Sequence, residues 1–312
     1  MSFLVIGECV ADIVPAPAGS AAADRVHPGG SPANVAHGLG RLGRDVTLLT
    51  QLADDDTGRL IEAHLRDAGV RVEVGGRPPR TPSAVVGLDA HGGATYRFDI
   101  AWTLTGGAPA GLAPDHVHIG SIAAVTAPGA AAVLAETERL RARATVSYDP
   151  NVRPALMGEH GAAVARVERC VALSDLAKAS DEDLAWLYPD EEPHTVAARW
   201  LGLGPALVLV TRGAAGSFAL GRKHLVEAAA LPVAVADTVG AGDSFMSAVL
   251  DALAGQGRDA LGTLDAEDLD GLLRRASAAA AVTVSRGGSW PPDRDELEAA
   301  LREEALRSGR AR

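Results

Sequence analysis

Cysteine and lysine are scarce in this sequence. Its 312 residues include only two cysteines, Cys9 and Cys170, which are too few and too far apart to indicate a disulfide framework or a metal-binding motif. We expect both to be small buried side chains in a reducing compartment. Only two lysines are present, Lys178 and Lys223, and the net charge is −11. This balance leaves no basic stripe for nucleic acid or an anionic membrane.

Long hydrophobic runs are also missing. No apolar stretch approaches the roughly 20 residues that a transmembrane helix needs. The N-terminal run Phe3–Ile6 is too short for the core of a signal peptide and has no basic flank. The sequence therefore predicts a cytoplasmic protein.

Two common nucleotide-binding motifs are absent or misplaced. The sequence has no G-x-x-x-x-G-K-[ST] loop, which excludes a P-loop. A G-x-G-x-x-G run does occur at Gly38–Gly43, but it closes a predicted helix and precedes a predicted strand. A dinucleotide-binding fingerprint has the reverse order, with the strand before and the helix after. We therefore interpret Gly43 as a glycine that ends a helix.

The sequence does contain a regular alternation of strand and helix patterns. Hydrophobic residues make up 47% of the chain, which is ample for a buried core. Apolar runs typical of strands lie at Ser2–Gly7, Val46–Leu52, Val117–Gly120, Ala144–Asp149, Leu207–Thr211 and Ser217–Leu220. Helical spacing of apolar residues lies at Ala33–Leu42, Gly58–Ala68, Gly129–Arg143, Ala162–Ala172, Thr195–Gly202, Ala241–Ala254 and Leu269–Val284. This order predicts an α/β fold over residues 1–312, with a mostly parallel sheet and helices on both faces.

Three segments fall outside this alternation. Residues 11–26 and 70–102 contain short alternating runs, and within the second the glycine-containing stretch 89–93 separates two runs in a pattern typical of a β-hairpin. The charged segment Arg294–Arg312 predicts a short solvated helix with a frayed terminus.

The most informative segment is Asp237–Phe245, which reads DTVGAGDSF. Residues 231–235 before it have the apolar character of a strand and the residues after it have helical spacing, so this loop opens a helix. Free N–H groups and the dipole make a helix start an anion site, and the small residues Gly240–Gly242 keep it bare. Asp243 in the first turn could accept the proton of a hydroxyl that attacks a phosphate. The alternative, that Asp243 is only an acid favoured by the dipole, stays open.

A second glycine pair lies near the N-terminus. Residues 29–36 read GGSPANVA and lead into a predicted helix. Together with residues 237–243, this segment resembles the two signature motifs of the ribokinase-like carbohydrate kinases, in the order and at the separation of that family. The resemblance covers essentially the whole chain. Residues 7–12, 148–154 and 210–217 are similar to the fructokinase branch in particular.

The resemblance implies a three-layer ribokinase-like fold that forms a single kinase domain over residues 1–312. Its approximate segments 11–26 and 70–102 would form a small β-sheet lid over the sugar site. Closure of such a lid would exclude water and so suppress hydrolysis of ATP.

The resemblance also assigns roles to individual residues. Asp243 would be the general base, and the N–H groups of Gly240, Ala241 and Gly242 would bind the transferring phosphoryl group. The sugar would be bound by Asp12, Gly29, Gly30, Asn34, Asp99 and Arg153. From the residues alone, a turn at a strand end is the favoured interpretation of Asp12 and a helix N-cap that of Asn34. Arg153 is equally compatible with a structural ion pair.

ATP and Mg²⁺ are the cofactors that the family implies, with K⁺ as a further candidate. Thr211, Gly213 and Gly216 would line the phosphates of the nucleotide, and Ser277 and Ala281 would face its adenine edge. Asp237 and Thr238 resemble the monovalent-cation loop of related kinases.

One departure from the family concerns the metal. The family often has an Asn-x-x-Glu segment near the magnesium site, where this chain has Ser180 and Asp183. Asp183 could still hold a magnesium-bound water at greater reach.

The expected acceptor is a neutral sugar. Asp99–Trp102 lacks the Tyr-x-Arg pair that grips the carboxylate of sugar acids, and Ser31 stands where a lysine would favour a phosphorylated sugar. Fructose is the first expectation, with ribose, another ketose, a sugar acid or a nucleoside behind it. The partners would be this sugar, ATP and, by analogy with relatives, a second copy in a homodimer. A sugar or nucleotide sensor without catalysis is the alternative from another class.

Overall fold

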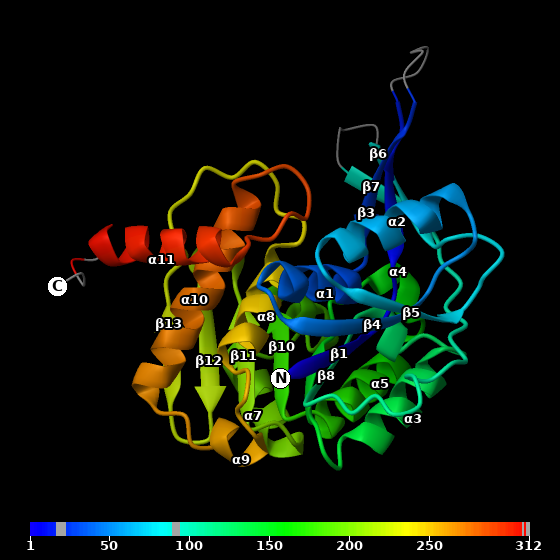
Figure 1. Ribbon diagram of the computed structural model, residues 1–312. Coiled ribbons are helices and arrows are strands. Elements are labelled where there is room, and N and C mark those ends of the chain that lie inside the picture. The colour runs from blue at the N-terminus through cyan, green and yellow to red at the C-terminus, as the bar shows by residue number, and fades with distance from the viewer. Residues whose placement is uncertain (17–22, 89–93, 308, 310–312) are drawn as a thin grey trace.

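The computed structural model describes residues 1–16, 23–88, 94–307 and 309. Its centre is a nine-stranded sheet with the order β13-β12-β11-β10-β9-β8-β1-β4-β5 (Figure 1). The strands are β1 (Ser2–Ile6), β4 (Asp45–Gln51), β5 (Arg71–Gly76), β8 (His116–Gly120), β9 (Thr145–Asp149), β10 (Leu176–Ser180), β11 (Leu207–Thr211), β12 (Ser217–Gly221) and β13 (Leu225–Ala228). The pairs from β5 through β11 are parallel, and β12 pairs in antiparallel fashion with β11 and β13.

Side chains of the central strands enter two hydrophobic cores, one on each face of the sheet. In β1, Leu4 and Ile6 belong to one core and Phe3 and Val5 to the other, because successive strand residues point to opposite faces. Helices α3 (Ala130–Leu140), α5 (His160–Leu173), α6 (Asp181–Leu187) and α7 (Pro193–Leu203) pack into the first core, and α1 (Ser31–Arg41), α2 (Asp56–Asp67), α8 (Ala241–Ala252) and α10 (Ala266–Val284) into the second. The predicted mostly parallel sheet with helices on both faces is confirmed.

Three further helices complete the main layers. They are α4 (Pro154–Met157), α9 (Arg258–Leu261) and α11 (Arg294–Arg307), with short 3-10 turns at Ile122–Ala124 and Gly213–Ala215. The predicted C-terminal helix is confirmed as α11, and it packs on α10 through the buried Leu297. The predicted frayed end falls on residues 308–312, of which the structure describes only residue 309. No described helix is long and apolar enough to cross a membrane.

A smaller four-stranded sheet stands beside the main one (Figure 1). It contains β2 (Val10–Val14), β3 (Arg25–Gly29), β6 (Ser83–Leu88) and β7 (Ala94–Asp99), in the order β3-β2-β6-β7. Because β2 follows β1 after a short turn, this sheet rises from the carboxyl end of β1. The predicted hairpin is present as the antiparallel pair β6 and β7, while its turn at 89–93 lies outside the described residues.

Two sequence predictions about strands are wrong. The segment 70–102 was assigned to the lid, but β5 within it pairs with β4 and forms the edge of the main sheet. Residues 231–235 do not form a strand. Pro232 has no N–H group to donate to a ladder, and Val233 and Val235 are 37% and 63% exposed. These two valines therefore alternate along a loop in which both are exposed.

Local predictions that depend on single residues agree with the structure. Cys9 and Cys170 are both free and buried. Gly43 follows the end of α1 with a φ of 75°, in the left-handed region that favours glycine. The G-x-G-x-x-G run therefore ends a helix and does not open one.

Candidate active site

The start of α8 is a bare helix terminus. Gly240 precedes it with a φ of 76°, and a Cβ at this position would lie 2.6 Å from the Cβ of Ser289. A Cβ on Gly242 would lie 2.9 Å from Nζ of Lys178. Gly240 is therefore required by its backbone angle and its contact with Ser289, whereas a side chain at position 242 would displace the end of the Lys178 side chain. With glycine at both positions, an anion can approach the first turn of the helix.

Asp243 lies in this first turn and is held by α1. Its Oδ1 accepts a 2.7 Å hydrogen bond from Oγ of Ser31, and its Oδ2 accepts a 2.8 Å bond from Nδ2 of Asn34. The Asp243 carboxylate is buried, with 8% of the residue exposed. An acid favoured only by the helix dipole needs no such partners, so the two bonds support a specific orientation of the carboxylate. Ser31 is a site residue that the sequence did not predict.

Asn34 is not the N-cap of α1, since that position belongs to Gly30. The Asn34 side chain lies between two other segments. Its Nδ2 donates to Asp243, and its Oδ1 accepts a 3.3 Å bond from Oγ of Ser289. The amide is thus oriented by both partners.

Asp12 lies in the middle of β2, where it pairs with His27 of β3. A Cβ on Gly29 would lie 2.3 Å from Oδ2 of Asp12, so the Asp12 carboxylate rests directly against Gly29. Gly30 has a φ of 99°, and a Cβ there would lie 2.5 Å from the carbonyl oxygen of Glu8. The two glycines therefore bring Asp12 close to the start of α1.

Burial raises the pKa of Asp12 to about 6, with Arg153 opposing the shift and Asp243 adding to it. Burial also raises the pKa of Glu8 to about 7, against hydrogen bonds from Ser121 and Ala123 and the charge of Arg153. The Arg153 guanidinium thus acts on both carboxylates.

Arg153 itself is held by backbone groups. Its Nη1 donates to the carbonyl oxygens of Asn151 and Val152 and to Oδ1 of Asn151, and no ion pair of the described residues includes it. The structural ion pair considered from the sequence is therefore not seen in this part of the chain.

Asp99 is the last residue of β7 and is exposed. It pairs with Ser83 of β6 in the lid sheet. None of the hydrogen bonds around Asp243 includes it, so its place at the sugar rests on the resemblance alone.

A buried ion pair lies behind the helix start, and sequence reasoning missed it. Nζ of Lys178, on β10, donates a 2.7 Å bond to Oδ2 of Asp149 at the carboxyl end of β9. Burial acts to lower the pKa of Lys178, but the negative charge of Asp149, with smaller effects of Asp183 and Asp243, raises it overall. The signal was available, because Lys178 is one of only two lysines.

The residues predicted to bind the nucleotide come from two segments of the chain, the end of β11 with the turn that follows it and helix α10. Thr211 ends β11 beside Ser180 of β10, and a 2.7 Å bond from the N–H of Arg212 to the carbonyl of Gly216 closes the following turn. Gly213 and Gly216 have φ values of 50° and 89°. Ser277 and Ala281 lie one turn apart on α10 and are partly exposed. Their roles toward phosphate and adenine stay predictions.

Asp237, which with Thr238 is predicted to bind a monovalent cation, links its own loop to the segment at Gly288. Its Oδ1 accepts from the N–H of Val239 at 3.0 Å, and its Oδ2 accepts from the N–H of Gly288 at 2.9 Å. The carbonyl of Thr238 accepts from the N–H of Ala241 at 3.3 Å. Carbonyl oxygens held in this way are a suitable donor set for a hard cation.

Asp183 is a capping residue of α6. Its Oδ2 accepts from the N–H of Ser180 at 2.8 Å while the Ser180 hydroxyl accepts from the N–H of Asp183, which is a capping box. Its Oδ1 accepts from the N–H of Val152 at 2.7 Å. The described residues contain no group of three or more His, Cys, Asp or Glu side chains that could hold a metal ion. A Mg²⁺ ion therefore fits here only with phosphates and water as its main ligands.

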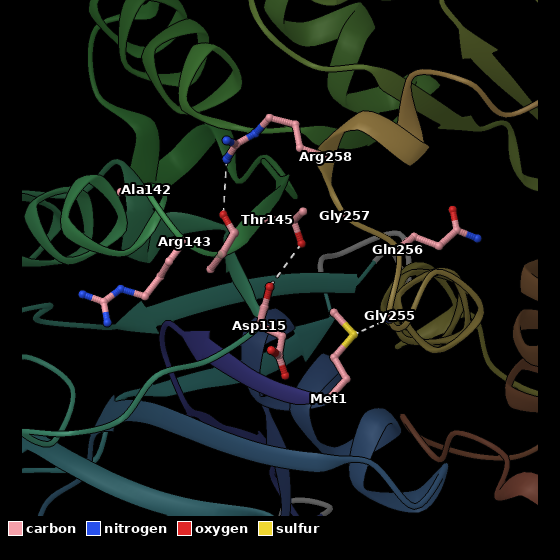
Figure 2. A pocket seen from close by; sticks show the side chains of 10 residues that line it. Met1, Asp115, Ala142, Arg143, Thr145, Gly255, Gln256, Gly257 and Arg258 are labelled. Carbon is pink, nitrogen blue, oxygen red and sulfur yellow. Dashed lines mark hydrogen bonds between the residues drawn. The ribbon is translucent and has the colours of Figure 1, made fainter.

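A pocket of about 440 Å³ lies elsewhere, at the amino ends of the strands. Its lining includes Met1, Asp115 before β8 and Thr145 at the start of β9, and Figure 2 shows Arg143 and Arg258 around it. Ligands of open α/β sheets bind at the carboxyl ends of the strands. This pocket is therefore separate from the site at the start of α8.

The fold and the site together define a kinase that acts on a small hydroxylated molecule. The chain belongs to the pfkB family of carbohydrate kinases, whose sequence model matches residues 2–295.

Similar proteins include several fructokinases. The chain is 34% identical over 307 residues to the fructokinase of Klebsiella pneumoniae, covering 95% of this chain and 98% of that protein. The solved fructokinase of Xylella fastidiosa with bound ATP has a TM-score of 0.85 and 28% identity, covering 97% of this chain and 99% of that one. A fructokinase double mutant of Vibrio cholerae O395 with fructose, ADP and potassium ion has a TM-score of 0.81 and 25% identity, covering 96% and 98%.

Proposed function

We propose that this protein transfers the γ-phosphoryl group of ATP to a hydroxymethyl group of fructose. The observation that carries the proposal is the Asp243 carboxylate, fixed by Ser31 and Asn34 beside the open N–H groups of the α8 start. The fructokinases of Klebsiella pneumoniae and Xylella fastidiosa support fructose and ATP as the substrates.

The proposed reaction is a direct displacement at phosphorus. The hydroxymethyl oxygen of the sugar attacks the γ-phosphorus, a new O–P bond forms, and the bond from the γ-phosphorus to the β–γ bridging oxygen breaks. The hydroxyl proton passes to the Asp243 carboxylate, and ADP leaves with the bridging oxygen. Because the transition state is loose, orientation of the hydroxyl contributes more than basicity.

Negative charge on the transferring group is stabilised by the helix start. We assign the phosphoryl oxygens to the N–H groups of Gly240, Ala241 and Gly242, of which that of Ala241 would exchange its 3.3 Å bond to the Thr238 carbonyl for the ligand. Lys178 would add positive charge behind Gly242. Mg²⁺ bound to the ATP phosphates would neutralise part of their charge. The loop with Asp237 and Thr238 would hold K⁺.

Sugar recognition is proposed for Asp12, Asn34 and Arg153. A carboxylate accepts hydrogen bonds from vicinal hydroxyls, while an amide both donates and accepts. The carboxylates of Asp12 and Asp243 make this side of the site acidic, and this favours a neutral sugar over a sugar acid or a phosphorylated sugar.

The test is ADP release with ATP and Mg²⁺ across fructose, ribose, 2-keto-3-deoxygluconate, fructose 6-phosphate and adenosine. We expect turnover with fructose that falls at least 1,000-fold in Asp243→Asn, because the amide cannot take the proton. Asp190→Asn is the matched control, since Asp190 is exposed and lies in a loop after α6.

Other outcomes assign other functions. Turnover only with the sugar acid or the phosphosugar would keep the kinase and reject a neutral acceptor. Binding of sugar or nucleotide without turnover on any acceptor would favour a sensor.

A further inference from the structure

A short segment after α10 contacts both halves of the candidate site. We call residues 286–291 the strap. In the strap, Oγ of Ser289 donates to Asn34 on the sugar side at 3.3 Å. The Cβ of the same serine fills the space in which a Cβ of Gly240 would lie, on the phosphoryl side. Ser289 therefore fixes both the sugar-side amide and the start of α8.

The strap is fastened near its ends by ionic and backbone contacts. Nη2 of Arg286 donates to Oε1 of Glu296 at 2.6 Å, and the N–H of Gly288 donates to Asp237 at 2.9 Å. At the far end, Nε of Arg41 donates to the carbonyl of Pro291 at 2.8 Å. These contacts hold the strap before and after Ser289, and the residue that directly follows Ser289 adds a further contact.

That residue is Trp290, which packs against an aromatic pair from two other helices. Its ring centroid lies 5.5 Å from that of His37 on α1 and 5.6 Å from that of His64 on α2, and the two histidine rings are 4.1 Å apart. The guanidinium carbon of Arg41 lies 5.2 Å from the Trp290 ring, close enough for a cation–π contact.

Trp290 contributes little to the core, because 43% of the residue is exposed. A large aromatic side chain at such a position is explained better by a local task than by burial. Among the described residues, the contacts of its ring lie on α1 and α2, and α1 is the helix that supplies Ser31 and Asn34 to the base. The ring thus connects the strap to the helix that orients Asp243.

We propose that Trp290 is a positioning residue of the kinase. Its ring, held between His37, His64 and Arg41, keeps Ser289 in place so that Asn34 and Gly240 hold sugar and phosphoryl group in the correct relative position. Trp290 acts through Ser289 and does not itself touch the substrates.

The proposal predicts a specific kinetic change in Trp290→Leu, which keeps an apolar side chain but loses the ring contacts. We expect kcat to fall about tenfold and the KM for the sugar to rise several-fold, with Trp290→Phe restoring most of both. The melting temperature should change by less than about 3 °C, as expected for a half-exposed residue. A merely structural role would lower the melting temperature and the active fraction and would leave KM unchanged.

A double-mutant cycle tests whether Trp290 acts through Ser289. Ser289→Gly removes the side chain through which Trp290 acts, so the effects of Ser289→Gly and Trp290→Leu should combine to less than their product. Effects that multiply fully, or an unchanged KM in Trp290→Leu, would overturn the proposal.

The kinetic test of Trp290 rests on the proposed function, because it needs an active kinase. A matched control variant and the wild-type protein distinguish failure of the inference from failure of the proposed function. Trp186 is a partly exposed tryptophan in ring contact with His160 at 4.8 Å, away from the strap. Trp186→Leu should leave kcat and KM unchanged. Wild-type protein without turnover on any sugar would count against the proposed function, whereas active wild type with unchanged Trp290→Leu counts against the inference alone.

Discussion

Lys178 and Asp149 form a 2.7 Å ion pair in which both side chains are at least 95% buried, directly behind Gly242. Removing two charges from water is costly, and a buried pair of this kind often stabilises a fold no better than apolar residues of similar volume. Because the pair lies beside the helix start that we propose to bind the phosphoryl group, we propose that it takes part in charge stabilisation.

Lys178→Met should affect both stability and activity. The substitution leaves Asp149 buried without its partner, and we expect the free energy of unfolding to fall by about 3–5 kcal/mol. The double variant Lys178→Met with Asp149→Leu should regain most of this stability without regaining kcat. Urea unfolding and ADP release measure the two properties, and recovery of activity in the double variant would contradict a role for the positive charge.

Glu8 gives a prediction for stability against pH. Burial raises its pKa in the folded protein to about 7, above the ordinary value of 4.5. Between these values the folded protein retains a proton that the unfolded chain has lost, so stability contributed by the protonated form is present at pH 4 and is lost as pH rises through 7.

The variant Glu8→Gln should remove this dependence, because glutamine is neutral at every pH and can still accept the N–H bond of Ala123. We expect the variant to gain about 3 kcal/mol relative to wild type between pH 5 and pH 8. Thermal melts at a series of pH values are the measurement. Parallel curves for the two proteins would show that Glu8 does not titrate in this range.

Much of this architecture could be predicted from local sequence patterns. The alternation of apolar runs and helical spacing specified the layers, and the glycines around Asp243 specified the helix start, because these signals lie within a few residues of one another. Residues 231–235 were misread because an apolar alternation is the same in a paired strand and in an exposed loop. The expectation that residues 70–102 all belong to the lid is wrong for a related reason. The pairing of β5 with β4 depends on how the whole sheet packs, which the local sequence of β5 does not show.

The parts of the site that were missed depend on contacts between distant segments. Ser31 reaches Asp243 across 212 residues, and Lys178 reaches Asp149 across 29. A single sequence carries no periodic signal for such pairs. The role of Trp290 depends in the same way on three elements that meet only after folding.

Asp12 predicts how sugar binding depends on pH. Its pKa is raised to about 6 by burial, against the charge of Arg153. If the ionised carboxylate accepts the sugar hydroxyls, the KM for fructose should rise about tenfold for each unit that the pH falls below 6. In Asp12→Asn the KM should be higher throughout and independent of pH in this range. A KM for wild type that stays constant from pH 7 to pH 5 would refute this role.

Variants of Asp183 can distinguish a helix-capping role of this residue from a role in metal binding. Its two carboxylate oxygens accept the N–H groups of Val152 and Ser180. We expect Asp183→Ala to lower the free energy of unfolding by about 1–3 kcal/mol, because the buried N–H of Val152 and the partly buried N–H of Ser180 both lose their partner. Asp183→Asn retains one acceptor oxygen and should fold better than the alanine variant.

The same pair of variants tests the magnesium prediction. If Asp183 serves mainly as a cap, the Mg²⁺ concentration for half-maximal turnover should change less than about threefold in Asp183→Asn, since the ion would be held by phosphates and water. The exposed neighbour Glu182 provides the control variant Glu182→Gln. An increase of tenfold or more in the required Mg²⁺, with an unchanged melting temperature, would instead place a magnesium-bound water on Asp183.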